Sequence, residues 1–70
     1  MAISYNGLWK LLIDRGMKKL DLKSRIGIST GTLAKLSKND QVALSVLERI
    51  CKELNCQFGD IVAYVPDENE

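Results

Sequence analysis

The chain has 70 residues, of which 46% are hydrophobic and 27% charged, and its ten Lys and Arg residues nearly balance nine Asp and Glu residues. This length suffices for one small domain, and the composition is typical of a globular protein. Apolar runs such as Leu11–Ile13 are far too short to span a membrane, and no secretory leader is apparent. The composition therefore predicts one cytoplasmic domain with no membrane association.

Histidine is absent and cysteine occurs only at Cys51 and Cys56, which limits the chemistry the chain can perform. A zinc site would need carboxylates or a second subunit, and the usual general base of enzymes is missing. The stretch GISTG, Gly27–Gly31, has too few glycines and no following lysine for a phosphate-binding loop. We expect no enzyme, no metal and no cofactor, with both thiols reduced and Cys51 in the core.

Charge is distributed unevenly along the chain. Residues 1–38 hold eight Lys and Arg against two Asp, whereas residues 39–70 hold two against seven acidic residues. Such asymmetry is expected where one surface meets a polyanion, and a solvated surface with internal ion pairs explains it equally well.

Apolar periodicity predicts a first helix that follows Ser4 and stops at Gly16. Ser4 is the expected N-cap, and Ile3 and Leu8 have the spacing of a hydrophobic staple. A second helix is predicted from about Lys19 to Ile26. The stripe of the first helix recurs at three- and four-residue spacing and consists of Tyr5, Leu8, Trp9, Leu12 and Ile13; that of the second is Leu22 and Ile26.

A third helix is predicted from Thr30 to about Lys38, with Asn39 in a left-handed position after it. The fourth begins between Ala43 and Val46 and ends near Asn55. Ser45 and Glu48 have the spacing of a capping box for this helix. The expected inward residues of the third and fourth helices are Leu33, Leu36, Leu47, Ile50, Cys51 and Leu54.

The end of the sequence predicts a short fifth helix over Phe58–Val62, capped by Gln57 or entered through Gly59. Ala63–Val65 is the only strand-like segment. We therefore expect an all-α bundle of five helices in one domain, residues 1–66, followed by a frayed acidic tail at 67–70.

Gly27 interrupts an apolar pattern between Ile26 and Ile28. Two short helices joined by three residues cross at a steep angle when the turn contains a residue free to take positive φ, and glycine does so at little steric cost. Ser29 can then cap the next helix by accepting a hydrogen bond from the amide of Gly31 or Thr32. The pattern predicts a helix-turn-helix.

At these residues the chain resembles the Cro and phage-repressor (XRE-like) family of DNA-binding proteins. The segment VLERICKELNCQFGDIV, Val46–Val62, is similar to the part that follows the motif in that family, so the resemblance covers about Ser4 to Val65. It implies a lambda-repressor-like fold with a central helix-turn-helix at Lys19–Lys38. The matching apolar and turn positions are Leu22, Ile26, Gly27, Ile28, Leu33 and Leu36.

Three positions depart from the family pattern. Lys23 replaces a usual alanine, Lys18 stands where a Ser or Thr cap is common, and Ser37–Asn39 replaces a frequent Glu-x-Gly. The stem of Lys23 can cover the helix crossing while its charge points outward.

The resemblance implies sequence-specific binding of double-stranded DNA by a small prokaryotic or phage-type transcriptional regulator, with residues 30–38 in the major groove. Lys35 is expected to read guanine O6 and N7 and Thr30 a nearby base edge or thymine methyl, while Lys19 contacts the backbone. The small side chains of Gly31 and Ala34 predict relaxed sequence preference. The expected DNA contacts are Lys19, Ser29, Thr30, Gly31, Thr32, Lys35 and Lys38.

Two further expectations concern partners. A helix-turn-helix fold can also serve as a protein-interaction module or an antitoxin-like partner, since fold alone does not decide function. A single domain of this size, with one recognition helix, makes few contacts with DNA, so a weak homodimer is expected. Ala63–Val65 has the composition of a strand that pairs across a two-fold axis or folds back on its own core.

Overall fold

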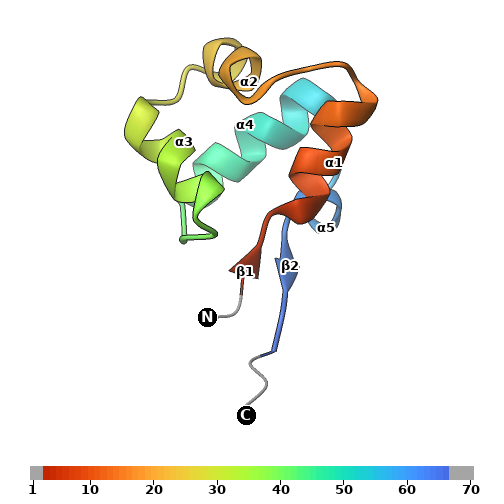
Figure 1. Cartoon of the computed structure of the whole chain (residues 1–70), viewed down its shortest axis with the longest axis vertical. Helices are drawn as coiled ribbons and strands as arrows, with labels where there is room; N and C mark the ends of the chain where they lie inside the picture. The colour runs from red at the N-terminus through yellow and green to blue at the C-terminus, as the bar shows by residue number, and fades with distance from the viewer. Residues whose placement is uncertain (1–2, 67–70) are drawn as a thin grey trace.

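Five helices and two short strands make up residues 3–66, the part of the chain that the computed structural model describes (Figure 1). The predicted tail at 67–70 lies outside the described residues. No helix within residues 3–66 is both long and apolar enough to cross a membrane. The elements are β1 (Ile3–Ser4), α1 (Asn6–Asp14), α2 (Lys19–Ile26), α3 (Thr30–Ser37), α4 (Leu44–Leu54), α5 (Phe58–Ile61) and β2 (Ala63–Tyr64).

Among residues 3–66, twelve buried hydrophobic side chains form the core, and every helix contributes to it. Burial of this apolar surface is the main source of stability for helices this short, because isolated helices of eight to eleven residues are marginal in water. The all-α, five-helix prediction is confirmed. The buried residues are Tyr5, Leu8, Leu12, Leu22, Ile26, Ile28, Leu33, Leu36, Leu47, Ile50, Leu54 and Ile61.

The start of α1 differs from the prediction. Its N-cap is Tyr5, whereas Ser4 lies in β1 and its Oγ accepts a hydrogen bond from Asn6 N–H at 3.2 Å. Because the cap is one residue later, Ile3 and Leu8 no longer have staple spacing. Ile13 is 75% exposed, since it lies about 100° around the helix from buried Leu12.

The cap of α4 also differs. Ala43 is its N-cap and Ser45 lies inside the helix, so the predicted capping box does not form. The end is as predicted, with Asn55 in the left-handed region at φ 51°. Cys51 is half-buried against the core. The expected cap of α5 is found at Gln57, whose N–H donates to the Asp60 carboxylate at 2.9 Å.

The strand-like segment of the sequence pairs within the chain. β2 runs antiparallel to β1, with Ile3 opposite Tyr64 and Ser4 opposite Ala63. The two ends of the described chain therefore lie side by side (Figure 1). Strands of two residues are too short to show a period in the sequence, which is why β1 was not predicted.

Candidate nucleic-acid interface

The turn between α2 and α3 depends on Gly27, whose φ of 69° and ψ of 36° lie in the left-handed region. The N–H groups of Gly27 and Ile28 donate to the carbonyl oxygen of Lys23, at 2.9 and 3.3 Å. Ile26 and Ile28 are both buried beside the turn. The predicted helix-turn-helix is thus present, and its glycine allows the change of direction between the two helices.

Ser29 caps α3 as predicted. Its Oγ accepts from the N–H of Thr32 at 3.1 Å and lies 3.1 Å from Thr32 Oγ1. This bond satisfies one of the free amides of the first turn and fixes where the helix begins. The two hydroxyls lie within hydrogen-bond distance of each other, and this contact helps to position α3; the DNA contacts predicted for both residues stay predictions.

The outer face of α3 presents small and cationic residues. Thr30, Gly31, Ala34 and Lys35 are exposed, while Leu33 and Leu36 anchor the opposite face in the core. Lys38, also exposed, follows directly as the C-cap residue. Because residues three and four apart share a helix face, these positions form one continuous stripe. Thr32 is half-buried at its border.

Lys19 links three helices. It is the first residue of α2, and its Nζ lies 4.3 Å from the centroid of the Trp9 ring in α1. The same Nζ is 3.5 Å from Ser37 Oγ at the end of α3. Sequence reasoning missed Trp9 and Ser37, because Trp9 fits the apolar stripe of α1 and gives no signal of a cation above its ring.

The loop after α3 is tied to the start of α1. Asn39 is left-handed, with φ 60°, as predicted. Its Oδ1 accepts from the backbone N–H of Tyr5 at 3.2 Å, and Tyr5 OH donates to the carbonyl oxygen of Asp40 at 2.7 Å. Burial raises the pKa of the Tyr5 hydroxyl. This loop is therefore held in place next to Lys38.

The unusual lysines of the motif are accommodated locally. Lys18 is the N-cap of α2 and its side chain has no acceptor, but its N–H donates to the Asp21 carboxylate at 2.9 Å. The carboxylate also complements the positive end of the helix dipole. Lys23 is half-buried within α2. Neither departure prevents the helix-turn-helix from forming.

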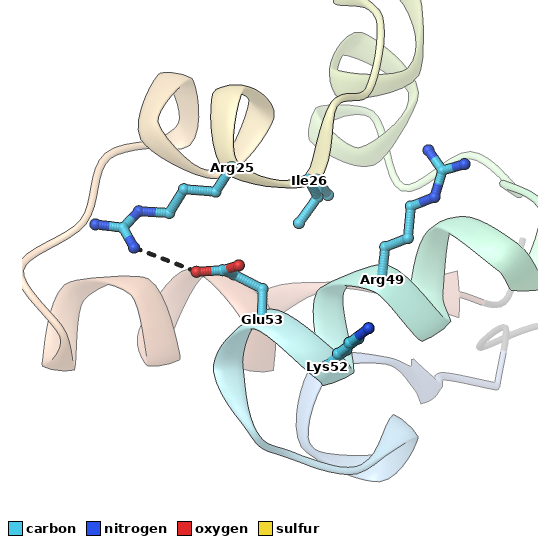
Figure 2. Close-up of a pocket in the computed structure, with 5 residues that line it drawn as sticks. All are labelled: Arg25, Ile26, Arg49, Lys52 and Glu53. Atoms are coloured by element: carbon cyan, nitrogen blue, oxygen red, sulfur yellow. Dashed lines mark hydrogen bonds and ion pairs between the residues drawn. The ribbon is translucent and has the colours of Figure 1, made fainter.

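A second group of cations lies between α2 and α4. Arg25 NH1 is 3.2 Å from Glu53 Oε2, which links the end of α2 to α4 (Figure 2). The cleft there measures about 380 Å³, and Arg49 in Figure 2 points away from the ion pair. Arg49 and Lys52, from the acidic half of the sequence, thus line the same cleft as Arg25, from the basic half. The lining residues are Arg25, Ile26, Arg49, Lys52 and Glu53.

Within residues 3–66, no three His, Cys, Asp or Glu side chains gather closely enough to hold a metal ion. The features that remain are a helix whose exposed stripe follows a glycine turn and the lysines Lys19 and Lys38 at the C-terminal end of that helix. These features define a helix-turn-helix DNA-binding domain.

Comparison with known proteins supports this class. Residues 7–67 match the Cro/C1-type HTH DNA-binding domain, and the chain belongs to this family. It is 43% identical to the uncharacterized HTH-type transcriptional regulator YozG of Bacillus subtilis (strain 168), across 99% of this chain and 83% of that protein. The crystal structure of transcriptional regulator VanUg, Form II, is similar with a TM-score of 0.92 and 56% identity, across 94% of this chain and 88% of that chain.

Proposed function

We propose that this protein is a transcriptional regulator that binds double-stranded DNA in the cytoplasm with α3 in the major groove. The observation that carries the proposal is the exposed stripe of α3, from Thr30 to Lys38, on a helix whose opposite face is anchored by Leu33 and Leu36. The groove admits a helix of this width, and the small residues Gly31 and Ala34 let its backbone approach the base edges.

The lysines have different roles in this arrangement. Lys35 lies exposed in the stripe, and we expect its ammonium group to donate to guanine O6 and N7. Lys19 and Lys38 lie at the C-terminal end of α3, where we expect them to neutralise phosphates and to carry no sequence information. Ser29 and Thr32 maintain the helix start through the bonds between them. We expect the remaining amides of that first turn to approach a phosphate.

Selection of bound duplexes from a random pool at low salt tests the proposal. An enriched motif is expected. On that motif, Lys35→Ala should cost about 1–3 kcal/mol and flatten discrimination at one base pair. Lys19→Ala should weaken binding to all sequences and reduce the slope of log K against log salt by about 0.9 for each phosphate that the variant no longer neutralises.

Glu48→Ala is the matched control, because Glu48 is exposed on α4 and is not part of the α3 stripe. If the folded parent binds no duplex at low salt, DNA recognition is wrong, and a protein-interaction or antitoxin-like role takes its place.

We also propose that the protein acts as a weak homodimer. One α3 stripe makes few contacts, and two-fold pairs on half-sites about one helical turn apart supply the remainder. Tyr64 and Val65, on and next to β2, are 67% and 48% exposed and offer apolar surface for a second copy. Sedimentation of the protein alone and on its selected duplex measures this; a monomer in both samples would contradict it.

A further inference from the structure

The C-terminal cap of α4 brings the two cysteines together. Asn55 takes the left-handed conformation, and the N–H of Cys56 donates to the carbonyl oxygen of Cys51 at 3.1 Å. This bond from the sixth residue back to the first is that of a Schellman motif. In such a cap the side chains of the first and last residues pack against each other, and here both are thiols.

Both thiols can be reached from solvent. Cys51 and Cys56 are half-buried and line an open pocket of about 380 Å³ together with Gln57, Phe58 and Gly59. Burial of the thiol, and then charge and hydrogen-bond interactions with Cys51, raise the pKa of Cys56 to about 11. The dependence of one thiol on the other is a second sign that they lie close together.

We propose that Cys51 and Cys56 form a dithiol site that exchanges reversibly with a low-molecular-weight disulfide such as glutathione disulfide. The proposal is independent of the DNA-binding function, since the site lies at the end of α4 and the start of α5, whereas α3 lies beside the other end of α4 (Figure 1).

The exchange takes two steps. The Cys51 thiolate attacks one sulfur of glutathione disulfide, whose S–S bond breaks, and a mixed disulfide forms as one glutathione thiolate leaves. Cys56 then loses its proton to solvent and attacks Cys51 Sγ, which releases the second glutathione. Two electrons pass from the protein dithiol to the small disulfide, which ends as two thiols.

The order of attack follows from the environment of the two residues. The raised pKa of Cys56 disfavours its thiolate, so we assign the first attack to Cys51. In the mixed disulfide Cys51 Sγ has no charge and no proton, so burial and the nearby Asp60 are the remaining causes that raise the pKa of Cys56. Closure requires loss of the Cys56 proton, and its rate is therefore expected to rise with pH. The cap holds the two residues in position for this second step.

The test uses the full chain, fully reduced and incubated with glutathione disulfide at mildly alkaline pH. Free thiols are then alkylated and the intact mass is measured. We expect a product lighter than the reduced protein by two hydrogen atoms, with no alkyl group and no attached glutathione. Cys51→Ser and Cys56→Ser each remove one partner, and we expect the remaining thiol of each to stop at a mixed disulfide.

Repeating the equilibration in concentrated urea separates the effect of the fold from that of short sequence spacing. We expect the equilibrium constant for ring closure to be about tenfold or more higher in the folded protein, because the cap pre-orients the thiols. Equal constants in the two conditions would overturn the proposal, as would a stable mixed disulfide or two alkylated cysteines in the folded parent.

Discussion

The ammonium group of Lys19 lies 4.3 Å from the centroid of the Trp9 ring and 3.5 Å from Ser37 Oγ. A cation above an indole is attracted by the negative face of the ring. The lysine is thereby held next to the end of α3 before any DNA is bound. The lysine therefore loses less side-chain conformational entropy when its remaining N–H groups bind a phosphate.

Trp9→Leu should weaken binding to all duplexes about two- to fivefold, which corresponds to the 0.5–1 kcal/mol of an exposed cation–π contact. Trp9→Phe keeps an aromatic face and should lose less. Titration of labelled duplexes of selected and random sequence with each variant measures both affinities. The two variants are also compared by thermal melting, so that loss of folding is not mistaken for loss of binding.

The double variant Trp9→Leu with Lys19→Ala provides the decisive control. If Trp9 acts through Lys19, adding Trp9→Leu to Lys19→Ala should cause little further loss of affinity. Fully additive losses would show that Trp9 does not position this lysine.

Gly27→Ala should lower the free energy of unfolding by about 1 kcal/mol, because a side chain at φ 69° is strained. A Cβ at this position would meet no atom within 4 Å, so the loss would come from the backbone alone. Chemical denaturation of both proteins measures the difference.

Gly59→Ala is the matched control, since its Cβ also meets nothing within 4 Å and its φ lies outside the left-handed region. Alanine is a better helix former than glycine, so this change should be neutral or slightly stabilising. Equal losses in the two variants would contradict the role assigned to the turn.

Chain reversals were predictable because their signals are local. Gly27 and Asn39 were expected to be left-handed from their positions after apolar stripes, and Asn55 was expected to end a helix; all three have positive φ. The Ser29 cap was predictable for the same reason, since its partner Thr32 is three residues away. The DNA contacts themselves stay predictions.

Contacts between distant segments were not predictable. The N-cap of α1 is Tyr5 and not Ser4, and Ser4 lies instead in β1, which pairs with β2 about sixty residues further along the chain. The hydrogen bond from Tyr5 to Asp40 and the ion pair from Arg25 to Glu53 likewise join residues 35 and 28 positions apart. Composition and period contain no information on which distant partner a polar side chain meets.

Gly7 is required by a close approach of α1 to α5. An added Cβ would overlap the carbonyl oxygen of Asp60 and lie 3.2 Å from its carbonyl carbon. Both atoms belong to the backbone and cannot move aside easily. Gly7→Ala should therefore lower the free energy of unfolding by about 1–3 kcal/mol, as overpacked cores do. The control variant is Gly31→Ala, because Gly31 is exposed and an added Cβ there would meet only Ser29 Oγ, at 3.8 Å. Equal stability of Gly7→Ala and the parent would contradict the close packing.

Tyr5 should make the stability of the fold sensitive to alkaline pH. Burial raises its pKa above the ordinary 10.0, so the folded protein holds the phenolic proton more tightly than the unfolded chain does. This contribution to stability is present below pH 10.0 and is lost as the pH rises through the higher folded value.

Tyr5→Phe removes the titrating group and the bond to Asp40, so it should cost about 1 kcal/mol at neutral pH and flatten the alkaline decline. Urea denaturation from pH 7 to pH 11 measures both effects. Because the pKa of Cys56 is also raised, to about 11, the comparison is made in a Cys56→Ser background. An alkaline decline that is the same with Tyr5 and with Phe at this position would show that the hydroxyl does not control it.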